Sequence, residues 1–331
     1  MRNALVGIAA VVGLLGLAAS LALRAAQAAP AQPQAQAPAQ AEARTQAQRL
    51  RADVQTLTQR FFPRDHAHPD NLDRAAAWLR AGFEQAGAAA VSEQPFEAGG
   101  RRYRHVVAAF GPEGGERVVV GAHYDAAGEL PGADDNASGV AGLLELARLL
   151  GAGPAPARRV ELVAYSLEEP PWFGTHRMGS AVHADGLRKQ GVRLVAMLSL
   201  EMIGYYSDAP DSQRYPAPEL AAVYPSRGNF IGVVGRIDDR AVVSRIERAM
   251  RAASALPVQS LAAPASLPGI GLSDHASYWR AGFTAVMVTD TAFHRNPNYH
   301  TAADTADTLD YARMAQAVQG VHAAVLDLAR P

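Results

Sequence analysis

Residues 121–139 read GAHYDAAGELPGADDNASG, and this stretch decides the fold that we expect. The apolar run 118–120 before it predicts a strand, and the run 140–150 after it predicts a helix. Acids and a histidine therefore lie at the carboxyl end of a strand, where open α/β sheets bind ligands. Three side chains here are of the kind that hold metal ions: His123, Asp125 and Asp135. One segment cannot complete a metal site, so further ligands must come from elsewhere in the chain.

Strands and helices alternate through the rest of the chain. Short apolar runs predict strands at 106–110, 117–121, 160–166, 194–200, 230–235 and 284–289. Apolar residues at helical spacing predict helices at 50–60, 72–86, 138–150, 237–253 and 309–329. This alternation is typical of a three-layer α/β/α fold with a mixed, largely parallel central sheet. We expect the metal site at the carboxyl ends of its strands.

The composition limits the classes of function. The 331 residues carry a net charge of -1, which gives no electrostatic footprint for nucleic acid. The chain has no cysteine, which excludes disulfides, thiolate metal sites and a cysteine nucleophile. A transition-metal site in this chain must therefore be built from His, Asp and Glu.

Two alternatives remain open for residues 1–24. The uncharged apolar run 4–23 is long enough to span a membrane once, which predicts a signal anchor. The segment is also compatible with a signal peptide, with the small residues 26–28 as its cleavage site. Both alternatives predict an extracytoplasmic protein, either periplasmic or secreted, and the first predicts that residues 4–23 anchor it to the membrane.

Residues 25–48 are rich in Ala, Gln and Pro and carry few large apolar side chains. A segment of this composition cannot bury a core, so it is predicted to be a linker. The folded domain is then predicted to span residues 49–331.

Further acids and a histidine follow the predicted strands. Glu168 and Glu169 follow the strand at 160–166, and Glu201 follows the strand at 194–200. Tyr299 and His300 come after the last predicted strand. Such residues at the ends of successive strands are what a metal site at the carboxyl edge of a sheet requires. Other histidines are expected at the surface or in loops: His66, His68, His105, His176 and His183.

The ordered motifs HxD, DDNASG, EE, E and YHT resemble the zinc-dependent aminopeptidase family of secreted bacterial leucyl aminopeptidases. This is peptidase family M28, whose relatives include glutamate carboxypeptidase II and the glutaminyl cyclases. The resemblance covers residues 105–310, and the sequence SDHASYW at 273–279 is similar to a stretch seen late in that family. It implies that residues 49–331 are a zinc exopeptidase catalytic domain that holds two zinc ions per chain.

The resemblance also implies the metal ligands. His123 and Glu201 match ligands of the first zinc, and Glu169 and His300 match ligands of the second. Asp135 matches the aspartate that bridges both ions, and the family often has a cis peptide bond directly after it. Glu201 departs from the family pattern, because the typical aminopeptidases have aspartate at this position.

The remaining functional residues follow from the same resemblance. Glu168 matches the general base, Tyr299 matches a tyrosine that stabilises the oxyanion, and Asp125 matches the acid that orients the imidazole of His123. The loop EEPPWFG replaces a glycine-rich loop of the relatives. Its Trp172 and Phe173 are expected either to line a specificity pocket or to pack the loop.

The expected function is that of a metallo-aminopeptidase, a zinc exopeptidase that hydrolyses the N-terminal bond of a peptide or aminoacyl amide. Water held between the metals would be the nucleophile, with Glu168 as its base. One alternative is a glutaminyl cyclase, which uses a single zinc and forms pyroglutamate, and another is a non-catalytic, peptidase-like ectodomain. The sequence does not predict the side-chain specificity, the oligomeric state or the roles of Asp274, Asp290 and Asp304.

Overall fold

The computed structural model describes residues 33–331, with side-chain burial from residue 40 onward. Two units are distinguished, residues 1–42 and 43–331. The described part of the first unit is helical and belongs to α2 (Pro33–Gln55), which includes residues 33–48 of the predicted linker. Ala and Gln are good helix formers, so this segment forms a helix although it carries few large apolar side chains.

The predicted anchor or signal segment at 4–23 lies outside the described residues. Among residues 33–331, no helix combines the length and the apolar character that crossing a membrane requires.

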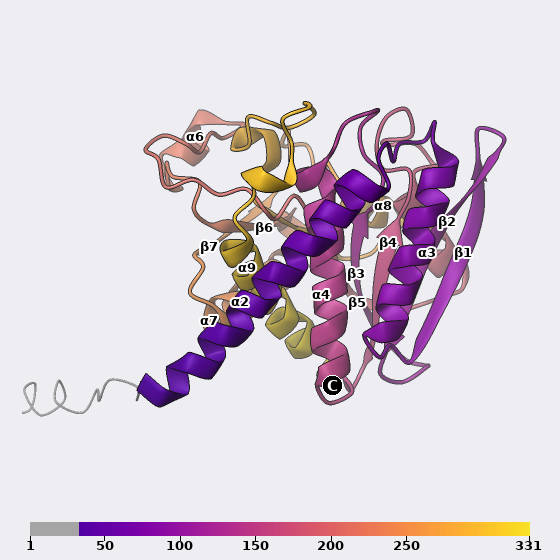
Figure 1. Ribbon diagram of the computed structural model, residues 1–331, viewed down its shortest axis with the longest axis horizontal. Helices are drawn as coiled ribbons and strands as arrows, with labels where there is room; N and C mark the ends of the chain where they lie inside the picture. The colour runs from indigo at the N-terminus through magenta and orange to yellow at the C-terminus, as the bar shows by residue number, and fades with distance from the viewer. Residues whose placement is uncertain (1–32) are drawn as a thin grey trace, which may run out of the picture. The chain divides into compact units, whose positions relative to one another are not determined.

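A mixed eight-stranded sheet runs through residues 43–331 (Figure 1). Across the sheet its strands are β1 (Ala90–Ala98), β2 (Arg101–Phe110), β4 (Arg159–Tyr165), β3 (Arg117–His123), β5 (Leu194–Glu201), β8 (Ala285–Thr289), β6 (Ile231–Arg236) and β7 (Val258–Ala263). The middle strands β4, β3, β5 and β8 are parallel to one another. Antiparallel pairs join β1 to β2, β2 to β4, and β8 to β6. The predicted α/β fold with a mixed sheet is confirmed.

Helices cover both faces of this sheet (Figure 1). The larger core lies under α3 (Pro69–Gln85), α4 (Gly139–Ala152), α7 (Arg240–Ala253) and α9 (Tyr311–Leu328). The smaller core, on the opposite face, lies under α5 (Gly179–Lys189) and α8 (His275–Arg280). The remaining short segments are η1 (Thr56–Arg60), η2 (Ala133–Ser138), α6 (Pro218–Ala221), η3 (Ile237–Asp239), η4 (Ala292–His294) and η5 (Ala306–Thr308).

Strand β3 shows why its apolar run is continuous. Val118 and Val120 contribute to the larger core, whereas Val119 contributes to the smaller core on the other face. A parallel strand that is covered on both sides needs apolar residues at every position, because successive side chains point to opposite faces. The same arrangement brings the carboxyl ends of β3, β4, β5 and β8 to one edge of the sheet.

Candidate metal centre

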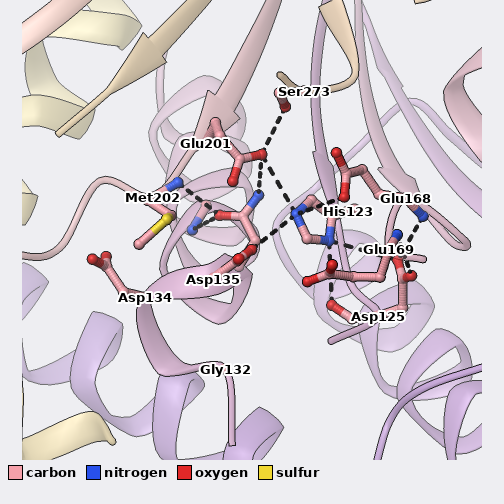
Figure 2. A network of polar contacts seen from close by, with 12 residues as sticks. His123, Asp125, Gly132, Asp134, Asp135, Glu168, Glu169, Glu201, Met202 and Ser273 are labelled. Carbon is pink, nitrogen blue, oxygen red and sulfur yellow. Dashed lines mark hydrogen bonds and ion pairs between the residues drawn. The ribbon is translucent and has the colours of Figure 1, made fainter. Parts of the chain in front are cut away.

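Figure 2 shows His123 close to five of the acids that the sequence singled out: Asp125, Asp135, Glu168, Glu169 and Glu201. His123 is the last residue of β3, and Glu201 is the last residue of β5. Glu168 and Glu169 come shortly after β4, and all four side chains are buried. The chain turns sharply at two of these strand ends, because Leu167 and Met202 adopt positive φ angles of 64° and 49°.

Asp135 lies between the two histidines. Its Oδ1 is 3.3 Å from Nε2 of His123, and its Oδ2 is 3.0 Å from Nε2 of His300. The carboxylate belongs to η2, whose backbone is not helical at Asp135 and Asn136, and the peptide bond between these two residues is cis, as predicted. One short side chain thus presents one oxygen to each histidine.

Two sets of metal-binding atoms share this aspartate. The first set consists of His123, Asp135 and Glu201, with Nε2 of His123 3.4 Å from Oε2 of Glu201. The second consists of Asp135, Glu169 and His300, with Nε2 of His300 3.4 Å from Oε1 of Glu169. In each set the ligand atoms lie within 4.8 Å of one another. Each set therefore has the nitrogen and oxygen atoms that a zinc site uses.

Two ligand atoms support this fit directly. Nε2 of His123 and Oε1 of Glu169 are buried without a hydrogen-bond partner in the described part of the chain. Buried polar atoms are normally paired, and a cation is one of the groups that satisfies them. The residues present therefore fit a pair of divalent ions that share Asp135.

The pKa shifts of the acids and of His123 also support a cation at this centre. Burial raises the pKa of Glu169 to about 7, and the carboxylate of Asp135 adds to this effect. Burial also raises the pKa of Glu201, although the nearby His123 opposes the shift. Burial alone would lower the pKa of His123, yet the carboxylates of Glu168 and Glu201 raise it well above its usual range. The buried acids outnumber the imidazoles, so a dication would relieve their mutual repulsion.

Glu168 belongs to neither of the two sets that share Asp135, although with His123 and Glu169 it forms a third group whose ligand atoms lie within 4.8 Å of one another. Its Oε2 is 3.9 Å from Nε2 of His123, which is longer than the corresponding distances of Asp135 and Glu201. Burial raises the pKa of Glu168 well above its ordinary value, and Glu169 and Glu201 add to the shift against the opposing charge of His123. A buried carboxyl group beside the candidate ligands, with its pKa raised in this way, is a candidate for proton transfer.

Asp125 holds the loop that carries the two glutamates. The backbone N–H groups of Glu168 and Glu169 donate to its two carboxylate oxygens, each at 3.1 Å. Nδ1 of His123 is 3.2 Å from the backbone carbonyl of Asp125 and 3.6 Å from Oδ1 of its carboxylate. Asp125 therefore positions both ends of the centre, whereas the sequence predicted contact with His123 alone.

Buried acids without a role predicted from the sequence accept hydrogen bonds from the loops around the centre. Asp304 accepts the backbone N–H groups of Asp134 and Asp135. Asp134 accepts the N–H of Gly204 and the side-chain amide of Asn296. Asp304 thus fixes the backbone of the bridging aspartate.

Two more acids of this group are buried. Asp290 accepts the N–H groups of Tyr205 and Ala292. The two carboxylate oxygens of Asp274 have no hydrogen-bond partner in the described part of the chain, and burial raises the pKa of this carboxyl group to about 7.

Arg64 supports the loop that leads from His123 to Asp135, and the sequence did not predict this role. It is fully buried, and its guanidinium donates to the carbonyls of Tyr124, Pro131 and Gly132, on the loop between His123 and Asp135. A lone arginine in the sequence FFPRDH carries no periodic signal, and its partners are backbone carbonyls that have no sequence signature.

The prediction that His105 and His183 lie at the surface is wrong. Only 1% of His105 and 4% of His183 is exposed, because β2 lies between β1 and β4 and the ring of His105 packs against that of His183 in α5, with centroids 6.0 Å apart. Of the other histidines in that group, His66 and His68 are partly exposed and His176 is exposed.

An apolar cavity of about 120 Å³ opens beside the centre. Glu201 and Tyr299 line the end near the candidate ligands, and the ring of Tyr299 stacks on that of His300. Side chains of large apolar or aromatic residues line the remainder, among them Tyr215, Leu220, Tyr224, Phe230, Leu261 and Ile270.

Two hydroxyls at the wall of this cavity are already paired with the backbone. The hydroxyls of Tyr215 and Tyr224 donate to the carbonyls of Pro225 and Ser260. Trp172 and Phe173 are not among the lining residues, and Trp172 instead packs over Gly99 in the β1–β2 turn. Of the two alternatives for that loop, packing is therefore the one observed for Trp172.

The fold and this edge of the sheet define an α/β protein with a candidate two-metal centre. The family model described as peptidase family M28 matches residues 105–325. The chain belongs to this family, and it is accordingly an enzyme that hydrolyses peptide bonds.

Two relatives illustrate the range of similarity. The chain is 48% identical over 282 residues to the uncharacterized protein YfbL of Escherichia coli, covering 83% of this chain and 86% of that protein. It is 30% identical over 224 residues to leucine aminopeptidase 1 of Ajellomyces dermatitidis, covering 64% of this chain and 52% of that protein. The chain thus spans about half the length of this fungal aminopeptidase.

Solved structures share the fold at low sequence identity. LapA of Legionella pneumophila matches with a TM-score of 0.69 at 23% identity, covering 86% of this chain and 73% of that chain. BSAP, a zinc aminopeptidase from Bacillus subtilis, matches with a TM-score of 0.65 at 16% sequence identity, covering 85% of this chain and 94% of that chain. A glutaminyl cyclase from Porphyromonas gingivalis matches with a TM-score of 0.63 at 21% sequence identity, covering 84% of this chain and 97% of that chain.

Proposed function

We propose that the protein is a zinc-dependent aminopeptidase with two zinc ions per chain. The observation that carries this proposal is Asp135, whose two oxygens face two different histidines, each accompanied by a glutamate. His123 and Glu201 would hold one ion with Asp135, and Glu169 and His300 would hold the other. The similarity to proteins named leucine aminopeptidase supports the same activity.

Two zinc ions at this position would supply Lewis acidity, which polarises the scissile carbonyl and lowers the pKa of water. The carboxylate of Glu168 takes the proton from the attacking water and passes it to the leaving amine. Its burial beside His123 and the candidate ligands supports this role, and burial also raises its pKa above the usual range of a carboxyl group. Tyr299, which lines the cavity near these groups, is placed to donate a hydrogen bond to the developing oxyanion.

The cavity supports a preference for a large apolar side chain on the residue that is released. Its lining is mostly aliphatic and aromatic, and the hydroxyls of Tyr215 and Tyr224 are already used by backbone carbonyls. An apolar side chain buried there would remove apolar surface of both the substrate and the cavity from water, which is favourable.

Glu168→Gln tests the mechanism. We expect kcat to fall by about 10²–10⁴-fold, because the amide cannot accept the proton, while zinc content stays at the wild-type level. The measurement is hydrolysis of leucine and phenylalanine amides together with metal analysis of the same samples. Glu129→Gln is the matched control, because its carboxylate is 72% exposed, and it should leave the rate unchanged.

The cyclase alternative makes different predictions. One tightly bound zinc per chain, with conversion of glutamine-terminated peptides to pyroglutamate, would contradict the aminopeptidase proposal. An unchanged rate in Glu168→Gln would contradict its role as the base while leaving the metal centre in place.

We also propose that the enzyme acts outside the cytoplasm, since residues 4–23 form an apolar run of the length that export signals and anchors have. Fusing residues 1–48 to a reporter that is active only after export tests this, and a reporter that stays inactive would contradict it.

A further inference from the structure

Glu201 is held by a serine from a different segment of the chain. Oγ of Ser273, in the loop before α8, donates to Oε2 of Glu201 at 2.7 Å (Figure 2). Both residues are buried, with exposed fractions of 1% and 6%. The same Oε2 faces Nε2 of His123, so the serine contacts the atom through which Glu201 enters the first set of ligands.

A second serine gives this contact a direction. Oγ of Ser199 is 3.0 Å from Oγ of Ser273. A hydroxyl has a single proton, and Ser273 gives its proton to Glu201, so Ser199 must be the donor to Ser273. Ser199 and Glu201 are two positions apart on β5 and therefore point to the same face. The two hydroxyls form a short relay that starts and ends on one strand.

The relay matters because Glu201 is longer than an aspartate. Its side chain has one more rotatable bond, and holding a flexible carboxylate in one orientation costs conformational entropy. Apart from His123, the other side chain near its Oε2 is the amide of Asn136, at 3.5 Å, which is a long hydrogen bond. Ser273 makes the shortest of these contacts and donates to the charged form of the carboxylate.

We propose that Ser273 is a positioning residue, which orients Glu201 for the metal ion on the His123 side of the centre. This inference rests on the proposed function, because it requires a cation held by His123, Asp135 and Glu201. Partners that orient a metal ligand typically change metal affinity by about 10–100-fold when they are removed. The effect belongs to one ion of the pair, since the hydrogen bonds of the Ser273 hydroxyl within the described residues go to Glu201 and Ser199 and none goes to Asp135, Glu169 or His300.

Ser273→Ala tests the proposal, with Ser277→Ala as the matched control. Ser277 is also buried and lies in α8, but its hydroxyl contacts Ser180 and Arg280 instead of a ligand. Zinc retained by the purified full-length variants is measured after dialysis against graded concentrations of a chelator. We expect Ser273→Ala to lose one zinc at about 10–100-fold lower chelator strength, while the second zinc and both zinc ions of Ser277→Ala behave as in the wild type.

Further variants separate positioning from a loss of packing. Ser273→Thr keeps the hydroxyl and should restore part of the affinity, and Ser199→Ala should shift the same zinc in the same direction by a smaller factor. The absorption spectrum of the cobalt-substituted enzyme should change in Ser273→Ala and not in Ser277→Ala, because only the former alters the ligand geometry. Urea unfolding of the metal-free proteins should show similar losses of stability for the two alanine variants.

The outcomes distinguish the two proposals. If the wild-type enzyme binds zinc and Ser273→Ala retains both ions equally well, the positioning role is overturned. The proposed function is then left intact. Equal weakening of both ions would also overturn it, because the effect would then be general. A wild-type protein without affinity for zinc would overturn the proposed function itself.

Discussion

The single carboxylate of Asp125 accepts the backbone N–H groups of both Glu168 and Glu169. Asp125→Asn replaces one of its acceptors with an NH₂ group that faces a donor, so one N–H of the Glu168–Glu169 turn loses its partner. We expect kcat/KM and zinc affinity to fall by about 10–100-fold. Steady-state kinetics and metal analysis check this, and a variant with wild-type values for both would show that the turn holds its shape without Asp125.

The sequence predicts the candidate ligands better than it predicts what supports them. His123 and Glu201 lie at or next to strand ends, which predicts that they meet at one edge of the sheet, whereas the choice of Asp135 as their common partner follows from the resemblance to the family. Arg64 acts on backbone carbonyls instead, and these have no residue-specific pattern. Ser273 likewise approaches Glu201 from a distant segment, a contact that depends on the placement of α8.

At the scale of elements, β6 and β8 form one wall of the cavity with Gly232, Val234 and Met287. Val234→Phe extends a side chain into this space, so kcat/KM for leucine and phenylalanine substrates should fall by about 10–200-fold, with a smaller loss for alanine substrates. A panel of aminoacyl amides measures this ratio. Val223→Phe is the control, because Val223 is 77% exposed and outside the cavity lining, and it should leave the ratio unchanged.

The packing of α5 on β2 predicts a loss of stability in acid. Burial lowers the pKa of His183 to about 4, and burial also lowers the pKa of His105 well below its usual range. Because the folded-state pKa lies below the unfolded value, this stability is complete above about pH 6.5 and is lost as the pH falls toward 4. For His183 the loss from pH 7.5 to pH 5.0 is about 2 kcal/mol.

Urea unfolding at pH 7.5 and pH 5.0 measures this contribution. His183→Phe should reduce the difference between the two conditions, whereas the exposed His176→Phe should keep the difference of the wild type. An unchanged difference in His183→Phe would mean that the imidazole is not the group that titrates.

Some elements follow from the sequence and others do not. The central strands β3, β4, β5 and β8 were predicted because burial on both faces makes them continuously apolar. β1 escaped prediction because it is an edge strand with mostly exposed residues, polar side chains and a proline. α5 and β7 also lack a strong apolar period, and tertiary contacts define them instead.

At the scale of the whole molecule, the buried acids predict that metal removal weakens the fold. A chelator would leave the carboxylates of Asp135, Glu169 and Glu201 close together without a cation. We expect the unfolding temperature to fall by about 5–15 °C, because a ligand at 1,000 times its Kd stabilises by about 4 kcal/mol. Calorimetry with and without chelator measures the shift, which added zinc should reverse, and an unchanged unfolding temperature would contradict metal binding at this centre.

Arg64 has a consequence for where this enzyme can be cut. It lies outside the segment 105–325 that defines family membership, yet its guanidinium fastens the loop that leads from His123 to Asp135. A fragment trimmed to the shared segment would keep every candidate ligand and lose the clamp that sets the spacing between two of them. The smallest catalytic unit is therefore larger than the family signature, and a minimal expression fragment has to retain the part of the N-terminal region that carries Arg64.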